Sequence, residues 1–392
     1  MVINLVRDIT SKDKMSYLVK TPSFCYFIKY FNDSLGFRES KITTVNKSAA
    51  KEIESHKKIR GSSKFMCDLE KKGFDIDNIV TKGSFERLFP LHIQLELTNN
   101  CNLSCDYCYR DSNYNNANSD YIDLDKLKKF LLKFKRQGLL EVGVTGGEPT
   151  LHPEFVHLMK FIIKNFELVE LVTNGTNSEI LLELLDCIPD SKHKLNLSIS
   201  FNKWFRELED FEKGNHYLNR TISKLSKNIP IRIIATDFFY SESKAKKLKD
   251  ALKKAGVKDI DFSYVAPIGR AKDKITEKEN ISRFPKSEIK DSFRPALLNC
   301  GLIFKHTVMD PKGNLRPCAL FSESYVIGSI NGFVDEKYRL LNEIPAPNED
   351  ICGSCEYLSY CVGCPYKGLF NSNINCSYRK FIKGKKRLRV LI

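Results

Sequence analysis

The stretch "ELTNNCNLSCDYCYRDS", residues 96–112, decides how the rest of the chain is interpreted. It holds three cysteines, Cys101, Cys105 and Cys108, in the spacing C-x3-C-x2-C. Structural zinc sites usually take four ligands in two pairs, and a disulfide framework pairs an even number of cysteines. Three thiolates leave one position of a tetrahedral metal or a cluster iron free. The spacing therefore predicts a metal centre that can bind a small molecule.

Length and composition limit the classes of protein. The chain has 392 residues, enough for two or three domains, and is 42% hydrophobic. Its net charge of +15 favours an acidic partner, either nucleic acid or an acidic peptide, although a lysine-rich solvated surface fits equally well. We find no membrane span and no signal peptide, so we expect a cytoplasmic protein with no membrane partner. Thiols stay reduced there, so clustered cysteines indicate metal rather than disulfides.

Residues 89–265 alternate β-rich runs with helical patterns. Strands are predicted at 92–98, 141–145, 168–173, 195–201, 231–236 and 259–265, and helices at 123–137, 153–166, 177–188, 205–226 and 241–255. Such alternation predicts parallel strands joined by helical crossovers. Six units are too few for an eight-stranded barrel, so the predicted fold class is α/β, a partial, open (β/α)6 barrel of the TIM type. The cysteine loop, "TGGEP", "TNG" and two serines fall at the ends of four successive strands, where barrel enzymes place their chemistry.

The regions outside the barrel differ in pattern. In residues 1–88, "SYLVK" and "FCYFIKYF" predict hairpin strands and 46–59 and 62–74 predict helices, which together suggest a small winged-helix-like module. The barrel is assigned to 89–269, and the charged, proline-containing stretch 270–298 is interpreted as a linker. Residues 299–392 are rich in cysteine, show little periodicity and end in a basic tail. We expect metal clusters rather than a hydrophobic core to hold them.

The cysteine loop resembles the signature of the radical S-adenosylmethionine (SAM) enzymes. In that family three thiolates hold three irons of a [4Fe–4S] cluster, and SAM chelates the fourth through its amino and carboxylate groups. The reduced cluster cleaves SAM, and a 5′-deoxyadenosyl radical abstracts hydrogen from the substrate. The resemblance assigns Cys101, Cys105 and Cys108 as ligands and places Tyr107 near the adenine. Soft thiolates and one open iron suit this chemistry, and a loop zinc site is the alternative.

A second motif supports the resemblance. "VTGGEPTLHPEF" (144–155) is similar to the GGEP motif of the family, here Gly146, Gly147, Glu148 and Pro149. Two glycines allow close approach of the backbone to the methionine part of SAM, and Glu148 is expected to accept a hydrogen bond from the ammonium group.

Weaker matches follow at the later strand ends. Asn174 in "VTNGT" is expected to make a polar contact to the cofactor. Ser198 and Ser200 stand where the family often has Ser-x-Asp-Gly; the carboxylate is missing, so only a hydroxyl contact to the ribose or methionine is carried over. Gly269 in "APIGRA" resembles a glycine turn that covers the adenine, and an ordinary strand exit is the alternative.

The C-terminal cysteines resemble the SPASM domain, the auxiliary-cluster module of peptide- and protein-modifying radical SAM enzymes. By analogy, one [4Fe–4S] cluster takes Cys352, Cys355, Cys361 and Cys376. A second cluster is then left with Cys300, Cys318 and Cys364. The last interval of the C-x2-C-x5-C-x2-C run has two residues where the family usually has three. Some relatives have an eighth cysteine at the position of His306, so either His306 ligates or the site is open. Two zinc sites are the alternative for this region.

The resemblance covers about residues 88–378 and implies SAM, three [4Fe–4S] clusters and a reductant such as flavodoxin or ferredoxin. It further implies a ribosomally made precursor peptide whose leader adds a strand to the N-terminal module. We expect a peptide maturase that forms a thioether, because a substrate cysteine could ligate an iron open to the barrel mouth. The alternatives are sulfatase-type formylglycine formation, epimerisation or carbon–carbon crosslinking. A metal-stabilised nucleic-acid-binding protein is the alternative of another class, but it gives no reason for GGEP beside three cysteines.

Overall fold

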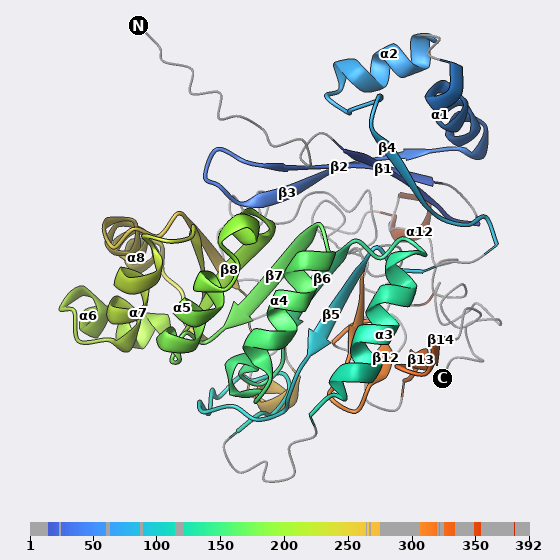
Figure 1. The fold of residues 1–392 in the computed structure, drawn as a ribbon. Helices are drawn as coiled ribbons and strands as arrows, with labels where there is room; N and C mark the ends of the chain where they lie inside the picture. Colours follow the sequence, from blue (N-terminus) through green and yellow to red (C-terminus); the bar gives the residue numbers. More distant parts are fainter. Residues whose placement is uncertain are drawn as a thin grey trace, which may run out of the picture.

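Two β-sheets organise the part of the chain that the structure, a computed structural model, describes (Figure 1). The described residues are 15–22, 25–59, 63–86, 89–113, 121–263, 265, 268–274, 306–319, 321, 325–333, 349–353 and 380. A four-stranded sheet lies near the N-terminus, and a ten-stranded sheet runs through the rest.

The six predicted parallel strands are present and lie side by side in sequence order. They are β5 (His92–Glu96), β6 (Glu141–Thr145), β7 (Leu168–Thr173), β8 (Leu195–Asn202), β9 (Ile231–Thr236) and β10 (Asp259–Ser263). Each pairs in parallel with the next along the chain. The predicted α/β arrangement with a parallel sheet is therefore confirmed.

Helices connect these strands, with one departure from the predicted pattern. They are α3 (Leu124–Lys135), α4 (Phe155–Asn165), α5 (Ser178–Asp186), α6 (Trp204–Glu212), α7 (Tyr217–Leu225) and α8 (Glu242–Lys254). The single helix expected over 205–226 is wrong, because α6 ends before Gly214, whose φ is +82°. Glycine takes this left-handed conformation without a Cβ penalty and so commonly ends a helix. The Nδ1 atom of His216 then caps α7 by accepting from the Leu218 amide.

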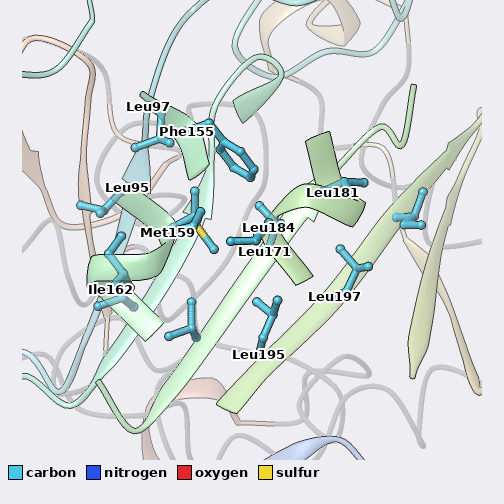
Figure 2. Packing of buried hydrophobic residues seen from close by; sticks show 14 of the residues in the cluster. Leu95, Leu97, Phe155, Met159, Ile162, Leu171, Leu181, Leu184, Leu195 and Leu197 are labelled. Carbon is cyan, nitrogen blue, oxygen red and sulfur yellow. The ribbon is translucent and has the colours of Figure 1, made fainter. Parts of the chain in front are cut away.

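The hydrophobic core lies between the parallel strands and their helices. Figure 2 shows Leu195 and Leu197 of β8 and Leu171 of β7 near Met159 of α4 and Leu184 of α5. These side chains are buried. Side chains alternate along a strand, so Ser198 and Ser200 of β8 lie on the opposite, inner face of the sheet.

The C-terminal region extends the same sheet beyond β5. β11 (His306–Met309) pairs in parallel with β5, and β12 (Asn314–Arg316), β13 (Gly328–Ser329) and β14 (Gly332–Phe333) continue antiparallel. The expectation that clusters rather than a core hold residues 299–392 is wrong for this segment. Its apolar side chains join the central core: Met309, Leu315, Phe321, Tyr325 and Ile327. Strands of two to four residues are too short to show a period of their own in the sequence.

The N-terminal sheet has the order β3-β2-β1-β4. Its strands are β1 (Ser16–Lys20), β2 (Cys25–Asn32), β3 (Arg38–Val45) and β4 (Ile79–Gly83), with helices α1 (Lys47–Ile59) and α2 (Lys64–Lys71) between β3 and β4. The expected hairpin strands and helices are present, whereas β3 and β4 had not been predicted. Leu18 and Phe27 pack with α2 residues such as Met66 and Leu69 on one face. The winged-helix-like assignment stays a prediction.

The other face of this sheet packs against the barrel. Tyr17, Ile28 and Tyr30 form an apolar cluster with Leu140 and Leu168, which lie where β6 and β7 begin. The Tyr30 hydroxyl also donates to Glu141 Oε1 over 3.0 Å. The N-terminal sheet is therefore fixed at the amino-terminal ends of the parallel strands (Figure 1).

Further bonds fasten this interface. The Asn196 side chain exchanges two 2.8 Å hydrogen bonds with the backbone of Arg38.

The predicted linker 270–298 lies outside the described residues beyond Lys274. No helix of the described chain is long and apolar enough to cross a membrane.

Candidate active site

The three-cysteine loop leaves the carboxyl end of β5. Cys101, Cys105 and Cys108 are all partly buried, and the Cys108 amide donates to the Cys105 carbonyl over 3.1 Å. Burial raises the pKa of Cys101, and it raises the pKa of Cys105 to about 12. The charges of Cys101 and Cys108 raise the pKa of Cys105 further, while Lys203 and Arg270 lower it.

The donor set fits an iron–sulfur cluster. Three thiolates from one loop are soft donors of the kind that iron–sulfur clusters take. The Leu103 amide also donates to Cys101 Sγ over 3.4 Å, a contact of the kind that tunes cluster potentials. The loop therefore suits a [4Fe–4S] cluster.

The two glycines of GGEP allow the turn after β6 to pack on the cysteine loop. The Gly147 amide donates to Thr98 O and the Glu148 amide to Asn100 O, both over 2.7 Å. A Cβ on Gly147 would come within 2.0 Å of the Asn100 carbonyl oxygen, and one on Gly146 within 2.7 Å of the Thr98 oxygen. Close backbone approach is thus required between two protein segments. The predicted approach to SAM stays a prediction.

The Glu148 carboxylate lies behind this turn and is fully buried. Its Oε1 accepts from the amide and the hydroxyl of Thr150 and from the Thr173 hydroxyl, at 3.1, 2.6 and 2.7 Å. Its Oε2 accepts from the Asn174 amide over 2.7 Å. Burial raises the pKa of Glu148, and these donors oppose the rise. Glu148 therefore joins the ends of β6 and β7, while its predicted bond to the SAM ammonium group stays a prediction. Pro149 opens the short 3-10 helix η2 (Pro149–Leu151) that follows.

Asn174 ties the end of β7 to the cysteine loop. Its Nδ2 donates to Asn102 Oδ1 over 2.8 Å and lies 3.9 Å from Cys101 Sγ. Its Oδ1 accepts from the amide and the hydroxyl of Thr176. The structure thus gives Asn174 a positioning role, and its predicted contact with SAM stays a prediction.

Tyr107 fixes the middle of the loop to β8 and β9. Its hydroxyl donates to the Thr236 carbonyl over 2.7 Å and accepts from the Lys203 amide over 2.8 Å. Its ring meets Phe238 edge-on, with centroids 5.4 Å apart. The ring is therefore held in one orientation at the strand ends, as a surface for a flat ligand would need. The predicted adenine contact is not tested by these bonds.

The segment after β10 closes over the same loop. Gly269 opens the 3-10 helix η4 (Gly269–Ala271), and Arg270 donates from Nη1 to Ser104 Oγ over 2.6 Å and pairs through Nε with Asp111 at 3.2 Å. Sequence reasoning singled out Gly269 but missed Arg270, although "APIGRA" contains both. Tyr217 of α7 was also missed. Its hydroxyl donates to the Asn174 carbonyl over 3.1 Å, and the charges of Cys105 and Cys101 help to raise its pKa after burial.

Of the cysteines expected to hold auxiliary clusters, the described residues include Cys318 and Cys352, both packed against the central core. The other five lie outside the described residues: Cys300, Cys355, Cys361, Cys364 and Cys376. Cys318 follows β12 in a turn, and the Phe321 amide donates to its carbonyl over 3.2 Å. The predicted ligation of Cys318 stays a prediction.

Comparison with known proteins defines the class of this enzyme. Residues 95–227 match the radical SAM superfamily, so this part of the chain is a radical SAM domain. Enzymes of this superfamily use SAM and a [4Fe–4S] cluster. This agrees with the cysteine loop, GGEP and the parallel strands.

Three known proteins show which members of this superfamily the chain resembles. The antilisterial bacteriocin subtilosin biosynthesis protein AlbA of Bacillus subtilis is 29% identical over 75% of this chain and 71% of its own length. The sporulation killing factor maturation protein SkfB of the same organism is 27% identical over 48% of this chain and 46% of its own. A crystal structure of Streptococcus suis SuiB bound to SAM covers 94% of this chain and 97% of its own, with a TM-score of 0.61 and 15% identity.

Proposed function

We propose that this radical SAM enzyme modifies a ribosomally made precursor peptide and that the product is a thioether between a cysteine sulfur and a carbon atom. The observation that carries the proposal is the similarity to AlbA, a bacteriocin biosynthesis protein, over 75% of this chain, a share far larger than the radical SAM domain. SkfB, named as a maturation protein, and SuiB, whose structure with the precursor peptide SuiA is similar in fold, support the same substrate class.

The residues of the candidate site have separate tasks in this proposal. Cys101, Cys105 and Cys108 hold the [4Fe–4S] cluster, which together with SAM supplies one-electron chemistry when bound. Glu148 and Asn174 fix the shape of the loop by joining it to the ends of β6 and β7. A flavodoxin or ferredoxin supplies the electron.

The inner face of the sheet and the turn after β10 face this site. Ser198 and Ser200 offer hydroxyl groups to SAM from β8, Tyr107 offers its ring, and Gly269 covers the loop from the other side. The hydroxyls stand in for the carboxylate that the family motif usually carries there.

The C-terminal cysteines supply the rest of the proposed chemistry. Cys352, Cys355, Cys361 and Cys376 hold one auxiliary [4Fe–4S] cluster, and Cys300, Cys318 and Cys364 hold another. A substrate cysteine would supply the fourth ligand of the second cluster. Binding to iron would deprotonate its thiol and prepare the sulfur for bond formation.

We place the leader peptide on the outer edge of β3. β3 spans eight residues and pairs only with β2 within the described sheet. An extended peptide can add a strand to such an edge through main-chain hydrogen bonds. The basic net charge of +15 favours an acidic leader.

This location sets a minimum length for the substrate. The N-terminal sheet is fixed at the amino-terminal ends of the parallel strands, whereas the cysteine loop follows their carboxyl ends. Strands of five to eight residues span about 17–26 Å at roughly 3.3 Å per residue. The peptide therefore needs at least about six extended residues between the leader and the modified residue.

Proline substitutions in β3 test the leader site. Neighbouring residues of an antiparallel strand direct their amides to opposite sides, so one of Thr43 and Thr44 points its amide away from β2. Proline at that outward position should leave the sheet folded but weaken binding of a precursor peptide that the unmodified enzyme modifies. Binding is measured by titration of a fluorescently labelled peptide, and cleavage of SAM without peptide should be unchanged.

The second proline variant is the matched control. Proline at the inward position removes a bond to β2 and should lower the melting temperature instead. Deleting residues 1–88 is a poorer test, since it would expose the buried Leu91, Leu140 and Leu168. Unchanged peptide affinity in both proline variants would contradict the proposed leader site.

A further inference from the structure

Glu96 is a buried carboxylate that joins two distant parts of the chain. It is the last residue of β5 and is fully buried. Its Oε2 lies 2.8 Å from Arg316 Nη2 and 3.4 Å from Arg110 Nε, and its Oε1 accepts from the Tyr109 hydroxyl over 3.3 Å. One carboxylate thus holds groups from the cysteine loop and from β12.

On the side of the cysteine loop, the residues that contact Glu96 lie next to both ends of the three-cysteine stretch. Tyr109 and Arg110 come directly after Cys108, and Arg110 also donates to Asn99 Oδ1 over 2.9 Å, two residues before Cys101. Both ends of the loop are therefore bound through residues that contact Glu96.

The other side reaches the turn that carries Cys318. Arg316, itself 1% exposed, donates from Nη1 to the Phe321 carbonyl over 2.7 Å. The Phe321 amide donates to the Cys318 carbonyl over 3.2 Å. The Arg316 guanidinium therefore holds the Cys318 turn with one arm and Glu96 with the other.

We propose that Glu96 is a positioning residue that makes the Cys101–Cys108 loop and the Cys318 turn move as one unit, so that SAM binding at the loop is transmitted to the turn. Separating the Glu96 carboxylate from the Arg316 guanidinium would leave two buried charges unpaired, which is energetically costly. A shift of the loop that moves Glu96 is therefore expected to move Arg316 with it. This coupling would hold the two candidate metal sites, the Cys101–Cys108 loop and the Cys318 turn, at a fixed separation. The inference rests on the proposed binding of SAM at the loop.

Hydrogen exchange followed by mass spectrometry tests this coupling in the reconstituted full-length protein, with and without SAM. In the unmodified protein, SAM should slow exchange in fragments covering 99–113 and also in fragments covering 314–321. In Glu96→Gln and Arg316→Gln, the first response should remain and the second should be lost. Arg316→Lys keeps the charge but has no second arm for the Phe321 carbonyl, so it should also lose the second response, whereas a role of charge alone would retain it.

A partly exposed ion pair elsewhere in the sheet provides a control. Arg232 of β9 pairs with Asp259 of β10 at 2.6 Å, so Asp259→Asn removes an ion pair between strands without touching the loop or the Cys318 turn. This variant should keep both responses. Persistence of the response at 314–321 in Glu96→Gln and Arg316→Gln, or its absence from the unmodified protein, would overturn the inference. Absence of the response at 99–113 in the unmodified protein would instead count against SAM binding at the loop and so against the proposed function.

Discussion

Gly269 lies directly against the carbonyl of Cys108, although Cys108 follows the first and Gly269 the last of the six strands β5 to β10. A Cβ at Gly269 would approach the Cys108 oxygen to 2.3 Å, and φ of Gly269 is +55°. The Arg270 amide donates to the same oxygen over 3.1 Å. The last cysteine of the loop is thus held by a turn that only glycine fits.

Gly269→Ala should therefore displace the loop and lower occupancy of its cluster. The added methyl group cannot avoid backbone atoms of Cys108 and Tyr109, so the loop must shift. We expect loss of the SAM-responsive part of the electron paramagnetic resonance spectrum after reconstitution, with the remaining clusters retained.

Gly214→Ala is the matched control for this variant. Gly214 has a similar left-handed φ of +82°, but a Cβ there meets nothing within 4 Å. This variant should lose only about 1–2 kcal/mol of stability from backbone strain and keep its cluster. Equal cluster loss in both variants would show that strain, not contact with Cys108, is responsible.

The number of clusters can be counted through iron. Ten clustered cysteines are expected to hold three [4Fe–4S] clusters, so anaerobically reconstituted protein should contain roughly twelve iron atoms and twelve sulfides per chain. Replacing Cys101, Cys105 and Cys108 together by alanine should remove about a third of the iron and abolish SAM cleavage. Stoichiometric zinc with negligible iron in the unmodified protein would contradict the prediction of three [4Fe–4S] clusters.

Cluster assembly should release protons. Burial raises the pKa of Cys105 to about 12 and also raises that of Cys101, so both thiols carry a proton at neutral pH in the metal-free protein. Iron binds the thiolate, so binding must expel these protons, and apparent iron affinity should fall as the pH falls. A pH-indicator dye in weak buffer measures the release.

The triple alanine variant supplies the comparison for this titration. It keeps the C-terminal cysteines but lacks the loop thiols, so it should release fewer protons per chain than the unmodified protein. The same release from both proteins would mean that the loop thiols are already ionised.

His306→Ala decides how the second auxiliary cluster is completed. The backbone at His306 starts β11, and Cys318 follows the strand paired with it, so both lie at one end of this hairpin. With a substrate cysteine as fourth ligand, the variant should keep an unchanged auxiliary-cluster spectrum until a cysteine-containing peptide is added. Cluster loss or a spectral shift without peptide would assign the position to His306 and contradict a substrate cysteine as the fourth ligand.

The sequence by itself determined the parallel sheet and the residues that meet at its end. Regular alternation of apolar strands and amphipathic helices predicted β5 to β10 nearly to the residue, because burial on the helix face of each strand imposes a local pattern. Spacing alone identified Cys101, Cys105 and Cys108, since ligand type and interval are local properties of the chain. The split of 205–226 at Gly214 was missed, because apolar periodicity continues across a single glycine.

Only the tertiary structure decided what those residues contact. Glu148, Asn174 and Gly147 were singled out for a cofactor, yet their bonds run to other strand ends and to the cysteine loop. The β11–β14 extension and the Glu96–Arg316 pair join segments far apart in the chain. Such contacts depend on which strand edge is free after folding, and the local pattern of apolar and polar residues does not contain this information. The fold thus links the Cys318 turn to the cysteine loop through a buried ion pair at the carboxyl end of one strand, β5.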